Sequence, residues 1–198
     1  MIMSDSNHSG KGLQGQQVED EEQFTGVTPG TDFTGTSLAF NFFTATNTTT
    51  SDAHVHWPAA SVQQASSYRR LAGQGHTFEQ RNFLQLEAVR VAEANYDSET
   101  AVAFSNPYSS VGIDFVAGHF NGQSMPSNAR VSVYLRAEGN EEEVVLLAEE
   151  QGAAWGEIEL RRTDGKAIEQ LKFALSTSKL DTASSTVYCF IYKMVMTA

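Results

Sequence analysis

Two histidines at alternate positions, His54 and His56, form the sharpest candidate metal site in this sequence. Alternate residues of a β-strand point to one face, so the two imidazoles can converge on a divalent ion such as zinc. Calcium would instead take carboxylate oxygens, which Asp97, Glu99 and Asp114 supply without the ordered spacing of a known calcium loop. A divalent cation, calcium or zinc, is thus a candidate cofactor, and solvated surface side chains are the competing interpretation.

Four aromatic side chains are candidates for binding a sugar: Trp57, Tyr68, Tyr96 and Tyr108. A flat ring offers an apolar face on which the C–H face of a sugar can stack, while the polar edge of Trp or Tyr stays hydrated. Trp57 follows a polar loop and precedes a proline, which indicates exposure. Aromatic side chains of a β-sandwich also build its core, so burial of these rings is the alternative.

Catalytic motifs are sparse in the sequence. Glu157 and Glu159 lie two residues apart on an expected strand, and paired carboxylates can serve as the acid and base of glycoside hydrolysis. The sequence lacks the Gly-x-Ser-x-Gly elbow of serine hydrolases, a phosphate-binding loop and the glycine fingerprint of dinucleotide-binding folds. The one cysteine, Cys189, excludes an intrachain disulfide and falls in an apolar run, which predicts a buried thiol rather than a nucleophile.

The charge balance argues against two classes of partner. The 198 residues carry 13 basic and 24 acidic side chains, a formal net charge of −11. Such a field repels phosphate backbones and anionic lipids, so neither nucleic acid nor a membrane surface is an expected partner. No apolar run reaches the roughly 18 residues that membrane insertion requires.

The first residues have neither the basic nor the apolar part of a signal peptide. The expectation for the chain as given is therefore a cytoplasmic protein or one exported by a route that leaves no N-terminal mark. A mature form whose signal has been removed is a further alternative.

The candidate metal-binding and sugar-binding side chains must be positioned by short strands that turn residues separate. Residues 1–23 contain few apolar side chains and no aromatic one, which predicts a flexible acidic tail. From residue 24 to 198, β-forming segments alternate with turn residues about every 8–12 positions. The predicted fold class is all-β: a two-sheet antiparallel β-sandwich, jelly-roll-like, spanning residues 24–198.

The segment 59–94 gives the weakest structural signal. Residues 59–71 have some helical character, which Gly73 and Gly75 interrupt. Residues 83–91 fit either a strand or a short helix, and the β-branched Val89 and Val91 favour the strand.

Three segments, in order, resemble the jelly-roll domains of bacterial surface and secreted proteins. Residues 24–35 resemble their opening strand and Pro-Gly turn, 102–115 their central pair of strands, and 168–173 their penultimate strand. This family is similar to carbohydrate-binding and galactose-binding-like modules, many of which bind calcium structurally. The resemblance implies a jelly-roll sandwich with a glycan ligand. The chain departs from the family in having no signal or sorting segment, and in lacking the usual acidic residue just before the last strand.

Three functions are compatible with these patterns. The leading hypothesis is a non-catalytic binding module for a carbohydrate or similar surface ligand, because no catalytic constellation is complete. A second is a small enzyme that acts on a small molecule in the sandwich cavity, with His54 and His56 as acid–base groups or metal ligands. A third is a structural or assembly protein whose tail mediates contacts. The sequence leaves the oligomeric state open.

Overall fold

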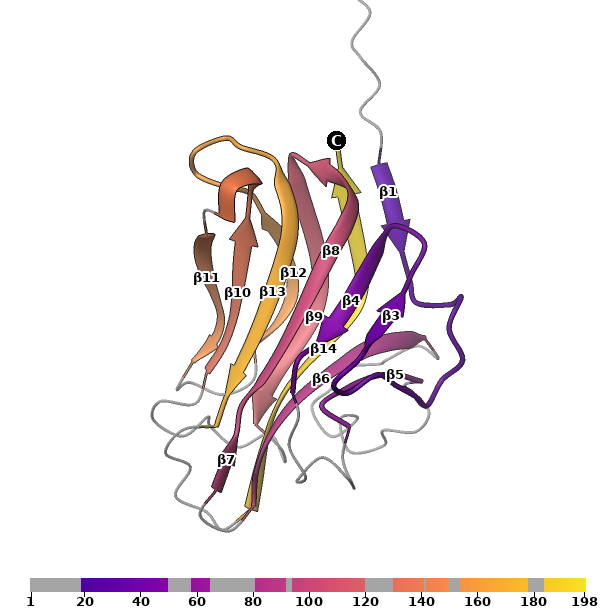
Figure 1. Ribbon diagram of the computed structural model, residues 1–198, viewed down its shortest axis with the longest axis vertical. Coiled ribbons are helices and arrows are strands. Elements are labelled where there is room, and N and C mark those ends of the chain that lie inside the picture. The colour runs from indigo at the N-terminus through magenta and orange to yellow at the C-terminus, as the bar shows by residue number, and fades with distance from the viewer. Residues whose placement is uncertain are drawn as a thin grey trace, which may run out of the picture.

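Two antiparallel β-sheets make up this protein (Figure 1). The computed structural model describes residues 19–49, 58–64, 81–91, 94–119, 130–140, 142–149, 154–177 and 184–198. Within these residues the chain forms strands and a 3-10 turn, Glu138–Asn140. The part of the chain so described contains no helix long and apolar enough to cross a membrane. The predicted all-β sandwich is therefore confirmed.

The larger sheet, sheet A, has the strand order β12-β9-β14-β6-β5-β2. Two further short strands join it: β1 pairs with the last residues of β14, and β7 pairs with the end of β6. The strands of sheet A are β1 (Glu19–Glu22), β2 (Thr31–Asp32), β5 (Ala60–Gln64), β6 (Asn82–Val91), β7 (Ala94–Tyr96), β9 (Ser110–His119), β12 (Ala154–Leu160) and β14 (Ser184–Thr197).

The second sheet, sheet B, has the order β11-β10-β13-β8-β4-β3 and lies in front of sheet A in Figure 1. Its strands are β3 (Ser37–Ala39), β4 (Phe43–Asn47), β8 (Ser98–Tyr108), β10 (Arg130–Arg136), β11 (Glu142–Glu149) and β13 (Ile168–Ser176). The chain passes from sheet B to sheet A at Ser109, whose N–H donates to the carbonyl of Thr197 at 2.8 Å. Asn106 and Pro107, whose residue types are typical of a turn, belong to β8.

The hydrophobic core lies between the two sheets and follows the alternation of the strands. On each strand every second side chain points inward, so apolar residues at alternate positions meet those of the facing sheet. Burying each large apolar side chain stabilises the fold by about 1.5–3 kcal/mol relative to its exposure. The inward-facing side chains of β6, β9 and β14 include Leu84, Leu86, Ile113, Val187, Ile191 and Met194, and those of β10 and β13 include Val131, Val133, Leu135, Leu171 and Phe173.

The segment that the sequence left open is extended where it is described. Ala60–Gln64, part of the segment predicted to have some helical character, is strand β5 and pairs antiparallel with β6. Asn82–Val91 is strand β6, as its β-branched end favoured. The helical prediction for 60–64 was wrong. Ala60 and Val62 are both buried against the core, and residues two positions apart share a face in a strand.

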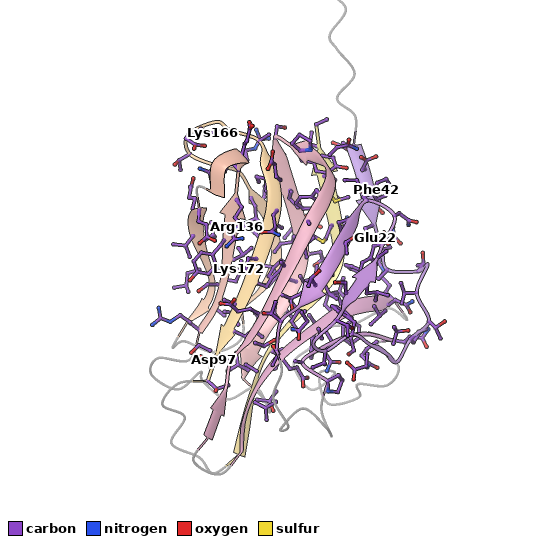
Figure 2. All side chains as sticks on the ribbon, in the orientation of Figure 1. Glu22, Phe42, Asp97, Arg136, Lys166 and Lys172 are labelled. Atoms are coloured by element: carbon purple, nitrogen blue, oxygen red, sulfur yellow. The ribbon has the colours of Figure 1, made fainter. Side chains whose placement is uncertain are left out.

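The ordered fold begins earlier than predicted. The sequence placed residues 19–23 in the flexible tail, but Glu19–Glu22 form β1, antiparallel to β14. Glu22, labelled in Figure 2, is buried. Its carboxylate accepts hydrogen bonds from the backbone N–H groups of Phe24, at 2.8 Å, and Asn41, at 3.2 Å. The acidic run misled the prediction because ladder hydrogen bonds come from the backbone and are independent of side-chain charge.

Cys189 is fully buried in β14, as predicted. Burial raises the pKa of its thiol to about 12, because the low-dielectric core disfavours the thiolate. We therefore expect almost no reaction with a thiol reagent such as dithionitrobenzoate in native protein at pH 8, and stoichiometric reaction in denaturant. Rapid labelling of the native protein would show that the core around β14 opens readily.

Candidate functional site

The outer face of sheet A, turned away from the core, carries the candidate functional site. The ladders place Glu157 of β12 opposite Asp114 of β9, and Asp114 opposite Lys193 of β14. One row further along, Glu159 lies opposite Gly112, which in turn lies opposite Val195. Because residues at directly opposed positions share a face, these two rows form one continuous surface across three strands.

A groove of about 380 Å³ follows these rows, and we call it the open groove. Gly112 has no side chain, so backbone forms part of its floor. Glu159 at its edge pairs with Arg161 at 2.7 Å. The groove is lined by Glu19, Ser110, Gly112, Ile113, Asp114, Glu157, Ile158, Glu159, Lys193, Val195 and Thr197.

Carboxylates dominate the charge of the open groove. Four acidic side chains and one ammonium group, that of Lys193, line it. Partial burial, and then the facing carboxylate of Glu157, raises the pKa of Asp114, while Lys193 and Arg81 oppose the shift. The groove thus offers several hydrogen-bond acceptors and one strong donor, and its net negative charge disfavours anionic ligands.

The outer face of sheet A continues from the groove into an aromatic cluster: Phe83, Val116, Tyr188, Phe190 and Tyr192, all buried. The Tyr188 and Phe190 rings stack with centroids 4.7 Å apart, and Phe83 lies 5.0 Å from Phe190. A bulge between Ile191 and Lys193 gives β14 one extra residue relative to β9. The bulge lets Tyr192 and Lys193 both belong to this outer side, where cluster and groove meet.

Two polar side chains of β6 lie beside the aromatic cluster. Glu87 is opposite Tyr188, and Gln85 is opposite Phe190. Burial raises the pKa of Glu87 to about 8, and a hydrogen bond with Gln85 opposes this only partly. At neutral pH this buried carboxyl group is therefore mostly protonated.

The structure corrects one of the predicted sugar-binding residues. Tyr108 is 2% exposed at the end of β8, and its ring packs edge-on against Phe104 with centroids 5.3 Å apart. Its hydroxyl donates to Asp20 at 2.7 Å, and burial together with this carboxylate raises the pKa of Tyr108 to about 12. The hydroxyl of Tyr108 thus links β8 to β1, and its buried ring has no face exposed to a sugar.

The other predicted site residues are placed only in part. His54, His56, Trp57 and Tyr68 lie outside the described residues. Tyr96 is in β7, at the register position opposite Val89. Among the side chains that the structure describes, no three His, Cys, Asp or Glu residues are arranged to hold a metal ion. Metal binding by His54 and His56, and sugar stacking on Trp57 and Tyr68, therefore stay predictions.

Sequence reasoning missed Gln85, Glu87, Tyr188 and Lys193. The signal for the first two was the alternation of residues 83–89, in which polar side chains interrupt one face of an otherwise apolar strand. Tyr188 was hidden in the apolar run 187–192, because a strand covered on both faces shows no polar alternation.

Comparison with known proteins confirms the fold class. No protein-family model matches the chain, and no curated protein matches its sequence. Among solved structures, the chain is similar to the K2 cleaved adhesin domain of Lys-gingipain, with a TM-score of 0.51 and 11% identity over 91% of this chain and 100% of that one. Its fold resembles that of an adhesin domain.

Two further solved structures show weaker similarity. The K1 cleaved adhesin domain of Lys-gingipain from Porphyromonas gingivalis W83 has a TM-score of 0.46 and 13% identity, over 91% of this chain and 98% of that one. The family 11 carbohydrate-binding module from Clostridium thermocellum, solved with a mixed-linked tetrasaccharide, has a TM-score of 0.40 and 10% identity, over 91% and 96%. At such low identity the likeness concerns the fold alone.

Proposed function

We propose that this chain is a non-catalytic binding module whose ligand is a neutral carbohydrate, held in the open groove on the outer face of sheet A. The observation that carries the proposal is the row Glu157–Asp114–Lys193 across three neighbouring strands. Carboxylate oxygens accept hydrogen bonds from sugar hydroxyls, and an ammonium group donates to them.

The rigidity of the site supports binding. The backbone of the row belongs to the ladders β12·β9 and β9·β14, not to loops, so the positions from which these side chains project are set before a ligand arrives. A preorganised site loses little conformational entropy on binding, which favours affinity. The adhesin-like sandwich is compatible with this role, although a fold by itself does not determine a function.

The charge of the groove predicts its selectivity. Three carboxylates, those of Asp114, Glu157 and Glu159, gather around a single ammonium group, so a uronic acid would be repelled. We expect neutral galactose- and glucose-based tri- and tetrasaccharides to bind and the corresponding uronate oligosaccharides not to bind.

Substitution in the groove tests the proposal. We expect Glu157→Gln to weaken the binding of a neutral tetrasaccharide about tenfold, because a charge-assisted acceptor is replaced by a weaker amide. Isothermal titration calorimetry measures the dissociation constant. Glu169→Gln is the matched control, since Glu169 is an exposed glutamate on β13 of the other sheet. Equal affinities of wild type and Glu157→Gln would place the ligand elsewhere, and no binding of any neutral oligosaccharide would refute the function.

A further inference from the structure

A second depression, of about 600 Å³, lies between the segment 23–29 and the paired ends of β5 and β6, and we call it the side hollow. Among the residues that the structure describes, its lining includes no carboxylate, and its one charged group is the guanidinium of Arg81. The polar side chains that line it are those of Gln23, Thr25, Thr28, Gln64, Arg81 and Asn82. Each of these residues is exposed or half-buried, so a ligand in solution can reach the hollow.

Hydrogen bonds from Asn82 hold the wall of the side hollow. Its side-chain amide donates to the carbonyls of Phe24, at 3.0 Å, and Val27, at 3.2 Å. Phe24 has a φ of 59°, a left-handed conformation that is uncommon for a residue other than glycine, and its ring is fully buried in the core. The turn that forms the wall is thus anchored to β6 and to the core, which lowers the entropy that a ligand must remove on binding.

Two interactions connect the side hollow with the open groove. The amide of Gln23, which lines the hollow, donates to Glu21, and Glu21 lies opposite Val195 of the groove. Arg81, which also lines the hollow, lies close enough to Asp114 of the groove to act on its carboxyl group electrostatically. The side hollow and the open groove are therefore neighbours.

We propose that the side hollow is a second subsite of the carbohydrate site, and that the ligand is an oligosaccharide which crosses the strands from the open groove into the hollow. The inference rests on the proposed function, because it concerns the same ligand, and it adds the length and direction of that ligand. Strands β12 and β5 are separated by β9, β14 and β6, which amounts to about 19 Å at a strand spacing of about 4.8 Å. A single sugar ring does not span this distance, so the ligand is a chain of several rings.

The chemistry of the two depressions is complementary. The open groove is rich in carboxylate oxygens, which accept hydrogen bonds from sugar hydroxyls. The side hollow adds the N–H donors of Arg81 and the amides of Gln23 and Gln64, each of which donates and accepts. Because a sugar hydroxyl both donates and accepts, one neutral oligosaccharide can satisfy the groups of both depressions.

Affinity should therefore depend on the length of the ligand. We expect the wild-type protein to bind a neutral β-1,4-linked hexasaccharide about tenfold more tightly than the trisaccharide of the same series, because only the longer chain fills both depressions. Isothermal titration calorimetry with gluco- and galacto-oligosaccharides of increasing length measures the dissociation constants.

Variants of the side hollow distinguish it from the groove. Arg81→Met should weaken hexasaccharide binding about tenfold, because a charged donor is lost, and Gln64→Ala should weaken it about threefold. Gln64→Ala changes no charge, so it should leave trisaccharide binding unchanged and is independent of the influence of Arg81 on Asp114. Arg130→Met is the matched control, since Arg130 is an exposed arginine on β10 of sheet B, and it should change neither affinity.

The outcomes separate this inference from the proposed function. Equal affinities of the wild type for trisaccharide and hexasaccharide would overturn the subsite, and so would undiminished hexasaccharide binding in Arg81→Met and Gln64→Ala. Equal weakening of both ligands in both variants would place these side chains at the groove and would also overturn it. In each case weaker binding by Glu157→Gln would leave the groove assignment standing. If the wild-type protein binds none of the neutral oligosaccharides, the proposed function fails and the subsite with it.

Discussion

Replacing Glu87 with glutamine is expected to make the free energy of unfolding less dependent on pH. Between pH 5 and pH 8.5, the difference in free energy of unfolding between wild type and Glu87→Gln should change by about 4 kcal/mol. In the folded protein, burial holds the pKa of Glu87 at about 8, whereas in the unfolded chain it returns to the ordinary value of 4.5. The protonated carboxyl group is thus favoured by folding.

Stability falls as the pH rises because the unfolded chain loses the Glu87 proton at a lower pH than the folded protein does. Below pH 4.5 both states are protonated, and the contribution of Glu87 to stability is fully present. Between 4.5 and about 8 the unfolded chain gives up its proton while the folded protein keeps it, so stability falls as pH rises. Above about 8 the loss is complete. Glutamine does not titrate, so the variant lacks this slope and is the more stable protein at pH 8.5.

Urea unfolding at pH 5, 6.5 and 8.5 measures the effect. The free energies of unfolding of wild type and Glu87→Gln should converge at low pH and diverge at high pH. The control is Glu169→Gln, an exposed glutamate whose replacement should shift all three values equally. Parallel curves for wild type and Glu87→Gln would mean that Glu87 is ionised in the folded protein.

Replacing Glu22 with alanine is expected to destabilise the protein by about 2–4 kcal/mol, which corresponds to a fall in melting temperature of roughly 4–16 °C. The Glu22 carboxylate, 2% exposed, accepts the backbone N–H groups of Phe24 and Asn41, which are 17 positions apart in the chain (24 and 41). Alanine leaves both donors without their partner and releases the contact between β1 and the turn that precedes β4.

Two further variants interpret that result. Glu22→Gln keeps one acceptor oxygen, so its loss of stability should be intermediate. Glu21→Ala removes an exposed carboxylate of the same strand and should change the free energy of unfolding by less than about 0.5 kcal/mol. A Glu22→Ala protein as stable as Glu21→Ala would show that β1 is held by its ladder with β14 alone.

The strands were predictable from sequence where one face of the strand packs on the core and the other does not, because apolar and polar residues then alternate. Residues 129–137 alternate cleanly because β10 buries Val131, Val133 and Leu135 against the core. The prediction failed where a run of apolar residues continues through a turn between two strands. The mainly apolar run 38–43 has the composition of a single strand, yet it spans the turn between β3 and β4, where the N–H of Phe40 donates to the carbonyl of Phe43.

The candidate site was less predictable. The alternation of residues shows which side chains share a face of one strand, but it does not show which strands lie next to each other in the sheet. The pair Glu157 and Glu159 was recognised as sharing a face, yet the groups that complete the groove, Asp114 and Lys193, come from two other strands. Only the register of the sheet brings them together. Exposure was equally hidden, since Tyr108 follows a Pro-containing segment typical of a loop and is nevertheless buried by packing from distant residues.

The position of β14 in the chain constrains how the protein is made. This strand is the last to be synthesised of those described, yet it pairs with β9, β6 and β1 and lies inside sheet A. In a growing chain that has reached residue 183, the edges of β6 and β9 that pair with β14 are still open, and the inward-facing side chains of β14 are missing from the core. Such nascent chains expose strand edges and apolar surface that invite aggregation. Sheet A can therefore be completed only after β14 has emerged from the ribosome, and pairing that joins strands so far apart in the chain is intrinsically slow.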